Sequence, residues 1–171
     1  MRFPLRSPGP GQLALRPRIF GAPQLLLDGQ PLPRREGGYQ VPAADGESRR
    51  AELLYRRDPF IPAVRLNGEI QEVVPHSPLA LALSILPLVL GAALGANLGD
   101  RLGTFPVLVL GVLTGATVGY FFQKAVYYVL RGPNPAFARV LITVGLYFAL
   151  LLTAVFVTAI LALLFPDRMA G

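Results

Sequence analysis

The sequence predicts an α+β membrane protein, in which a small N-terminal antiparallel β-sandwich or barrel precedes a three-helix transmembrane bundle with a glycine-zipper hairpin. Two observations support this fold class. Hydrophobic residues make up 53% of the 171 residues and charged residues only 15%, against roughly 25% charged in ordinary soluble domains. The charges are also unevenly placed: residues 1–77 hold 11 Arg and 8 acidic residues, whereas residues 78–166 hold five charged residues in all. The chain therefore combines a polar domain with a segment suited to a lipid bilayer.

Three apolar stretches are long enough to cross a membrane. At 1.5 Å per residue, about 20 helical residues span the hydrocarbon core of roughly 30 Å. We expect transmembrane helices at about 78–99, 103–130 and 135–166, followed by a short tail at 167–171. Pro87 lies inside the first of these helices and should kink it, because proline removes one backbone hydrogen bond.

The distribution of Lys and Arg predicts the orientation. Lys124, Arg131 and Arg139 surround the connection between the second and third helices, whereas the connection between the first and second has only Arg101. Positively charged loops remain on the cytoplasmic side. The first thirty residues contain five prolines and lack the apolar core of a signal peptide. We therefore expect a multi-pass protein of the inner membrane, with a cytoplasmic N-terminus and an external C-terminus.

Residues 12–76 are predicted to form a cytoplasmic β-module. Short apolar runs alternate with the turn dipeptides Asp28-Gly29, Gly37-Gly38, Asp45-Gly46 and Asn67-Gly68, and such dipeptides are typical of hairpins whose central residues need positive φ. The first eleven residues, with three prolines and two glycines, are expected to be a flexible arm. The candidate strands are residues 13–20, 24–27, 30–34, 39–41, 49–55, 63–66 and 69–74.

A weak internal repeat relates residues 20–29 to residues 60–68. Each copy has a Phe, then a Pro, then a short strand and a hairpin turn, and the second copy is one residue shorter. Duplication explains the match, and so does the chance recurrence of hairpins in a β-rich chain.

Glycine recurs at every fourth position of the first two predicted helices, which places the glycines on one helical face. Without side chains there, two backbones can approach closely. Residues 91–100 together with 111–119 resemble glycine-zipper membrane hairpins, a packing pattern of unrelated families that implies no shared function. We favour packing within one chain; the alternative is a homo-oligomer enclosing a pore. The expected packing residues are Gly91, Gly95, Gly99, Gly103, Gly111, Gly115 and Gly119, with Asn97 as an interhelical hydrogen-bonding residue.

The sequence contains few residues suited to catalysis or metal binding. It has no Cys and one His, which excludes disulfides, thiolate catalysis, cysteine-ligated zinc and multi-histidine sites within one chain. The central parts of the predicted helices lack ionisable groups, which weighs against proton-coupled transport and intramembrane proteolysis. We therefore expect a non-enzymatic protein without catalytic, cofactor or metal sites. No acid–base or metal-loop spacing is found among Glu47, Glu52, Asp58, Glu69 and Glu72.

Basic side chains are the remaining candidates for binding. Near an anionic leaflet each Lys or Arg contributes about 1 kcal/mol; a contact with a cytoplasmic protein partner and a simple solvated face are the other interpretations. Nucleic-acid binding is not expected, because basic and aromatic residues are not interleaved. His76 lies at the membrane entry, where we expect an interfacial or capping role. The candidate headgroup or partner contacts are Arg49, Arg50, Arg56, Arg57, Lys124, Arg131 and Arg139.

These observations predict an interaction or scaffolding protein held in the bilayer, with its β-module meeting a cytoplasmic partner or the anionic leaflet. The alternative is an oligomeric channel or transporter component, in which the glycine faces of several copies surround a path. An enzyme acting on lipid headgroups is least favoured, since no nucleophile and base pair is visible.

Overall fold

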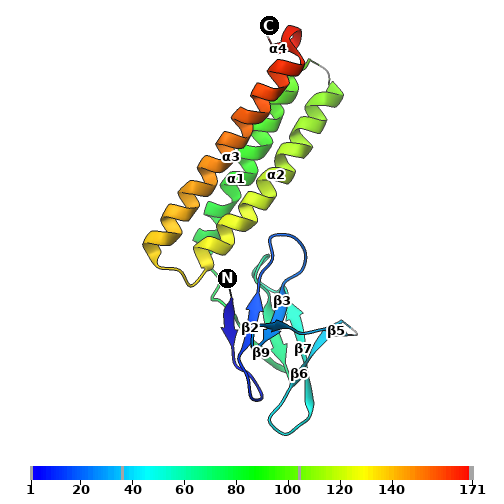
Figure 1. Cartoon of the computed structure of the whole chain (residues 1–171), viewed down its shortest axis with the longest axis vertical. Coiled ribbons are helices and arrows are strands. Elements are labelled where there is room, and N and C mark those ends of the chain that lie inside the picture. The colour runs from blue at the N-terminus through cyan, green and yellow to red at the C-terminus, as the bar shows by residue number, and fades with distance from the viewer. Residues whose placement is uncertain (1, 36, 104, 170–171) are drawn as a thin grey trace. The chain divides into compact units, whose positions relative to one another are not determined.

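The computed structural model describes residues 2–35, 37–103 and 105–169. The chain divides into two compact units, residues 1–77 with 131–133, and residues 78–130 with 134–171. The first unit holds two antiparallel sheets and the second holds three long helices (Figure 1). The predicted combination of N-terminal antiparallel sheets and three long apolar helices is confirmed.

The first sheet has four strands in the order β1-β2-β3-β4, and each strand is antiparallel to its neighbour. Its buried residues include Phe3, Leu13, Leu15, Leu25 and Leu26. The alternation of Leu13 and Leu15 with less buried neighbours directs one face of β2 into the core. The strand bounds are β1 (Phe3–Leu5), β2 (Leu13–Arg16), β3 (Gln24–Leu27) and β4 (Gln30–Pro31).

The second sheet has five strands in the order β5-β6-β7-β8-β9, again wholly antiparallel. Tyr39, Val41, Ala51, Val64 and Leu66 supply its buried residues. The buried hydroxyl of Tyr39 donates to the carbonyl oxygen of Pro23 at 3.2 Å, which ties this sheet to the segment entering β3. The bounds are β5 (Arg34–Arg35), β6 (Gly38–Pro42), β7 (Ser48–Leu54), β8 (Ala63–Leu66) and β9 (Glu69–Gln71).

The two segments of the internal repeat take equivalent positions. Each contains the last strand but one of its sheet, β3 or β8, and the two-residue turn at Asp28-Gly29 or Asn67-Gly68 that leads into the last strand. The φ angles are 50° and 84° in the first turn and 51° and 85° in the second, the left-handed values that a tight hairpin turn requires. The copies differ at their first residue, because Phe20 is exposed and Phe60 is buried.

The predicted flexible N-terminal arm is wrong for Phe3–Leu5, which form strand β1. β1 pairs with β2, Phe3 lies opposite Leu15, and the Phe3 side chain is buried. Pro4 is compatible with this strand because β1 is at the edge of its sheet, where a missing N–H costs least. The prolines and glycines suggested a segment too poor in apolar contacts to be ordered. Burial of Phe3 offsets the conformational entropy that the segment loses when β1 forms. Met1, which also belonged to the predicted arm, lies outside the described residues.

Prolines also set strand ends that the sequence pattern missed. The predicted strand 13–20 ends at Arg16 because Pro17 follows, and proline cannot donate to the ladder. The predicted strand 30–34 divides at Pro33 into β4 of the first sheet and β5 of the second. The chain changes sheets at that proline.

Within the second unit, the three long helices are α1 (Pro78–Arg101), α2 (Phe105–Arg131) and α3 (Ala136–Leu164), and all three are long and apolar enough to cross a membrane. They run alongside one another in Figure 1. A fourth, short helix, α4 (Pro166–Met169), occupies part of the predicted tail. The last two residues of that tail lie outside the described residues.

The buried residues of α1 follow one face of the helix, at Ala80, Ser84, Pro87, Gly91, Gly95 and Gly99. Their spacing of three or four residues is that of a single helical stripe. Small side chains therefore dominate the buried face of α1, whereas Leu79, Leu83 and Leu86 are exposed. In a hydrocarbon solvent that arrangement is favourable, because exposed leucine is as well solvated there as buried leucine.

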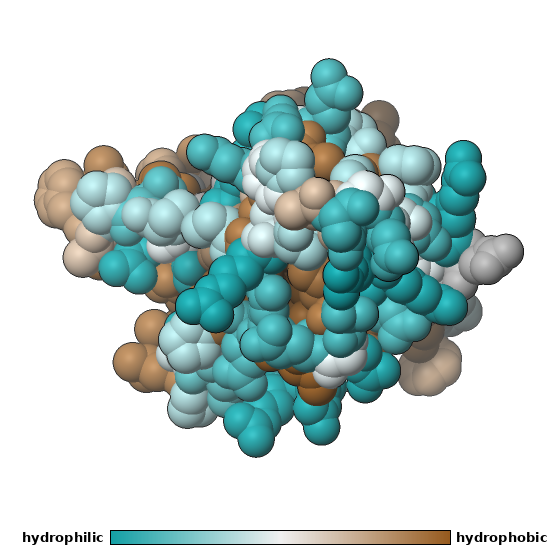
Figure 2. Space-filling model, turned by 90° about the horizontal axis from the view of Figure 1, so that it is seen from below, coloured by the Kyte–Doolittle hydropathy of each residue, from teal (hydrophilic) through white to brown (hydrophobic). Residues whose placement is uncertain are grey.

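The surface of the first unit is different in character. Figure 2 shows mainly hydrophilic side chains on the face turned to the viewer, with smaller hydrophobic areas between them. The contrast with the exposed apolar side chains of α3, among them Phe148, Val155 and Phe156, follows the uneven charge distribution of the sequence.

Candidate functional site

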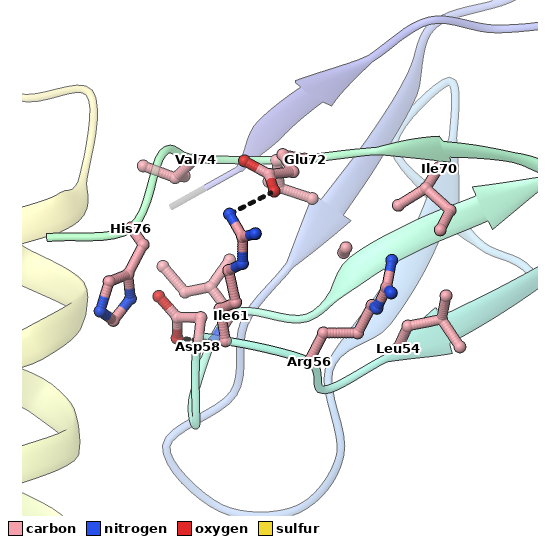
Figure 3. Close-up of a pocket in the computed structure, with 11 residues that line it drawn as sticks. Leu54, Arg56, Asp58, Ile61, Ile70, Glu72, Val74 and His76 are labelled. Atoms are coloured by element: carbon pink, nitrogen blue, oxygen red, sulfur yellow. Dashed lines mark hydrogen bonds and ion pairs between the residues drawn. The ribbon is translucent and has the colours of Figure 1, made fainter.

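A cavity of about 300 Å³ in the first unit brings together charged and apolar side chains. Its walls come from the end of β7, the loop that follows, the start of β8, β9 and the segment leading to α1 (Figure 3). The antiparallel pairing of β7 with β8 and of β8 with β9 brings these segments together. The lining residues are Leu54, Arg56, Arg57, Asp58, Ile61, Ala63, Ile70, Glu72, Val73, Val74 and His76.

Asp58 shapes the floor of this cavity. Its side chain is only 9% exposed, and its Oδ1 accepts hydrogen bonds from the backbone N–H groups of Phe60 at 2.9 Å and Ile61 at 2.7 Å. This is the turn that an aspartate makes with backbone two and three residues on. It holds Phe60 and Ile61 in buried positions. The sequence pattern assigned no role to Asp58, although Asp-Pro two residues before an aromatic residue is a recognisable turn signal.

Two arginines and a glutamate line the cavity above Asp58. Arg57 Nη1 lies 3.9 Å from Glu72 Oε1, and the two side chains are 78% and 59% exposed. An ion pair this long and this exposed contributes little to stability. Arg56 is also exposed. Both charges of the Arg57–Glu72 pair are therefore accessible to a ligand.

Charged and apolar side chains are interspersed along the cavity, because Val74 lies beside His76 and the Arg56 side chain lies between Leu54 and Ile70 (Figure 3). Asp58 and His76 lie at one end, and Leu54 and Ile70 lie at the other (Figure 3). The two arginines are balanced by two carboxylates, so the lining carries no excess charge when His76 is neutral. A cavity of this volume lies at the lower end of the roughly 300–1,000 Å³ of small-molecule sites.

The cavity collects only two of the seven basic residues singled out in the sequence, Arg56 and Arg57. Elsewhere in the first unit, Arg49 Nη2 lies 2.6 Å from Asp45 Oδ2, and Arg50 Nε lies 3.1 Å from Glu52 Oε1. The hydrogen bond from Arg49, followed by that from the backbone N–H of Glu47, lowers the pKa of Asp45. The carboxylate therefore stays ionised, and its bridge intact, further into the acidic range than an isolated aspartate would.

The other three basic residues belong to the helices. Lys124 lies within α2 and Arg131 is its last residue. Arg139, in the first turn of α3, donates from Nη1 to the carbonyl oxygen of Leu130 at 3.1 Å. Carbonyls at the end of a helix lack helical partners, so Arg139 closes the C-terminus of α2. The sequence predicts a headgroup or partner contact at Arg139, whereas in the structure its guanidinium bonds within the chain.

The glycines of α1 and α2 approach each other closely. A Cβ added at Gly91 would collide with the carbonyl oxygen of Gly115, and one at Gly95 would collide with that of Gly111. At Gly99 it would lie 2.5 Å from Leu108 Cα, and at Gly119 2.6 Å from the oxygen of Pro87. Real Cβ contacts are not this short, so no other residue fits without movement of the backbones.

Two residues expected in this packing lie elsewhere. Gly103 follows the end of α1 with a φ of 73°, and a Cβ there would meet nothing within 4 Å. Its freedom serves the turn, as expected for a glycine just past a helix C-terminus. Asn97 is exposed. It lies two residues from both Gly95 and Gly99, and a step of two residues turns a helix by about 200°, so it points away from the glycine face.

A second cavity, of about 250 Å³, lies among the helices of the second unit. Glycines of α1 and α2 and apolar side chains of α3, such as Leu150 and Val157, line it. Among the described lining residues, Thr114 and Thr153 carry the only polar side chains. Thr153 Oγ1 already donates to the carbonyl oxygen of Ala149 at 2.8 Å. This cavity therefore presents an apolar surface with little to orient a polar ligand.

Among the described residues, no group of three or more His, Asp or Glu side chains lies close enough to hold a metal ion. Comparison with protein-family models, with curated proteins and with solved structures gives no match to the chain.

Proposed function

We propose that the protein is a non-enzymatic interaction element of the inner membrane, with a cytoplasmic β-module anchored by α1, α2 and α3. The observation that carries this proposal is the division of the chain into a compact unit of sheets with a mixed-charge cavity and a second unit of three apolar helices. The orientation rests on the basic residues at the α2–α3 connection, Lys124, Arg131 and Arg139, against Arg101 at the α1–α2 connection.

In this proposal the contacts between the glycines of α1 and α2 form a glycine zipper within one chain. Close backbone approach supplies the van der Waals contact that holds helices together where no hydrophobic driving force exists between them. The glycine faces are then occupied by each other. This supports an anchor over the channel alternative, which requires those faces to be free for other copies.

The lining of the cavity among the helices points the same way. It consists of glycines and aliphatic side chains with two threonines, and an ion path needs charged rings or carbonyl oxygens that replace the hydration shell. Flux measurement tests the alternative directly. Liposomes containing the purified chain should release ions no faster than empty liposomes, and release that bulky substitution at Gly95 abolishes would favour the channel.

Photo-crosslinking in intact cells tests the interaction proposal. Phe20 is 67% exposed on the first unit and does not line the cavity, so p-benzoylphenylalanine can replace it with little change of shape. Phe148 of α3, 62% exposed, is the matched aromatic control. We expect one cytoplasmic protein, identified by mass spectrometry, to be attached at position 20 and not at position 148. A lack of protein adducts at position 20 and at a second exposed position, Arg34, would contradict the proposal.

A further inference from the structure

We propose that the mixed-charge cavity of the first unit binds the headgroup of a zwitterionic phospholipid, one that carries a phosphodiester and a primary ammonium group. Arg56 and Arg57 would hold the phosphate, Glu72 would accept hydrogen bonds from the ammonium, and the aliphatic wall would contact the glycerol end. This inference rests on the proposed function in one respect, that α1 is a membrane span.

The chain connects one end of the cavity directly to the start of α1. His76 lines the cavity, and α1 begins only two residues later, at Pro78. Since an extended chain advances by at most about 3.6 Å per residue, the Cα atom of His76 lies within about 7 Å of the start of α1. A lipid headgroup that lies beside the start of α1 would therefore be close to His76, at one end of the cavity.

The balance of charge selects the class of headgroup. Two arginines and two carboxylates line the cavity, so a headgroup that is only anionic would meet Asp58 and Glu72 as well as the arginines. A zwitterionic headgroup places its negative phosphate against the arginines and its positive ammonium against the carboxylates. The Arg57–Glu72 pair, 3.9 Å long and largely exposed, is the weak contact that such a ligand replaces, with phosphate on the guanidinium and ammonium on the carboxylate.

The hydrogen-bonding capacity of Glu72 favours a primary ammonium group in the ligand. A carboxylate such as that of Glu72 accepts hydrogen bonds, and a primary ammonium has three N–H donors. A quaternary ammonium has none, and it is best recognised by aromatic faces. Among the described residues that line the cavity there is no Phe, Tyr or Trp. Ethanolamine headgroups therefore fit this cavity better than choline headgroups.

The apolar part of the lining suits the neutral portion of a lipid. Leu54, Ile61, Ala63, Ile70, Val73 and Val74 supply it. Ile70 is 38% exposed although it is a large aliphatic residue, and contact with the glycerol and the first methylene groups would remove part of that area from water. A free phosphate ion would leave this wall uncovered, which favours a lipid as the source of the phosphate.

Native mass spectrometry of the full chain tests the inference. The detergent-purified protein is incubated with equimolar phosphatidylethanolamine, phosphatidylglycerol and phosphatidylcholine that share the same acyl chains. We expect the ethanolamine lipid to be retained at least threefold over each of the others. Excess glycerophosphoethanolamine should displace it, whereas glycerophosphocholine should not, because recognition lies in the headgroup.

Substitutions in the cavity should change this preference in a defined way. Glu72→Gln leaves the arginines in excess, so phosphatidylglycerol should replace phosphatidylethanolamine as the preferred lipid. Glu69→Gln makes the same chemical change on β9 outside the cavity lining and should preserve the wild-type preference. Arg56→Gln should lower retention of both lipids by about tenfold, the effect of losing one charge-assisted hydrogen bond.

Two results would overturn the inference. One is equal retention of the three lipids by the wild-type chain, and the other is identical lipid preference in the Glu72→Gln and Glu69→Gln variants. Either result leaves the crosslinking outcome at Phe20 untouched, so failure of the lipid site is distinguishable from failure of the proposed interaction function. Thermal unfolding of each variant identifies any loss of fold, and Arg56→Gln, at an exposed position, provides a second variant if Glu72→Gln does not fold.

Discussion

Pro87 lies inside α1 and has no backbone N–H, so the carbonyl oxygen of Leu83, four residues earlier, lacks its helical partner. The hydroxyl of Tyr147, on α3, donates a hydrogen bond to this oxygen at 2.6 Å. A single side chain thus satisfies the carbonyl that the proline leaves unpaired, and it joins two helices in doing so. An unpaired carbonyl in an apolar environment would be costly.

Removal of this hydroxyl should destabilise the helical unit. We expect Tyr147→Phe to lower the free energy of unfolding by about 1 kcal/mol, a typical value for one hydrogen bond, in SDS titration of the purified chain. In the Pro87→Ala background the new N–H can bond to the Leu83 oxygen, so the same substitution should cost much less. Equal losses in the two backgrounds would show that Tyr147 acts by packing alone.

Asp58 is a second residue on which local stability depends, because one of its carboxylate oxygens accepts hydrogen bonds from two backbone N–H groups. Asp58→Ala leaves both donors without this acceptor and should cost roughly 1–3 kcal/mol in thermal unfolding of the full chain. Asp58→Asn keeps an oxygen at the same place and should cost clearly less. If the asparagine variant is as unstable as the alanine variant, the negative charge and not the turn is what stabilises this loop.

At the scale of elements, the hairpin of α1 and α2 depends on the absence of Cβ atoms along one face of each helix. Gly95 and Gly145 make a matched pair for testing this. A Cβ at Gly95 would collide with the Gly111 carbonyl, whereas one at Gly145 of α3 would meet nothing within 4 Å. The same substitution should therefore have opposite effects at the two positions.

Gly95→Ala should destabilise the chain by roughly 1–3 kcal/mol, because the backbones must separate to accept the methyl group. Gly145→Ala should stabilise it by up to about 1 kcal/mol, since alanine loses less backbone freedom in a helix. SDS titration of both variants measures the difference. A neutral Gly95→Ala variant would contradict close packing of α1 against α2.

At the scale of the whole molecule, orientation is the property that the charge distribution predicts. The chain has no Cys, so one introduced thiol gives an unambiguous label. In intact spheroplasts a membrane-impermeant maleimide should label Arg101→Cys, at the end of α1, and should fail to label Ser48→Cys, in β7, until the cells are lysed. Labelling of Ser48→Cys before lysis would reverse the proposed orientation.

The sequence predicted the elements better than it predicted their partners. Helix length and apolar composition are local properties, so three long helices followed from runs of uncharged residues. Hairpins at Asp28-Gly29 and Asn67-Gly68 followed from the local demand for positive φ. Strand β1 was not predicted, because it forms through pairing with another segment, in which Phe3 is buried opposite Leu15.

The candidate site shows the same limit. The sequence predicts Arg56 and Arg57 as candidate binding residues because they form a basic pair. No residue near them in the chain indicates that Glu72 or His76 lies beside them in the fold. The register of β7, β8 and β9 brings these residues around one cavity. The sequence predicts Asn97 within the glycine packing, but it lies on another face of α1. Residues close together in the sequence can lie on opposite faces of a helix.

The sequence by itself determined the division between a charged β-rich unit and three apolar helices, because solvent preference, turn conformation and helix length depend on residues close together in the chain. Only the tertiary structure decided which charges meet around the cavity, and that Tyr147 satisfies the Leu83 carbonyl in α1. Those contacts join residues that are far apart in the sequence, for example 64 positions for Tyr147 and Leu83. Strand register and helix packing create such contacts, and no local pattern specifies them.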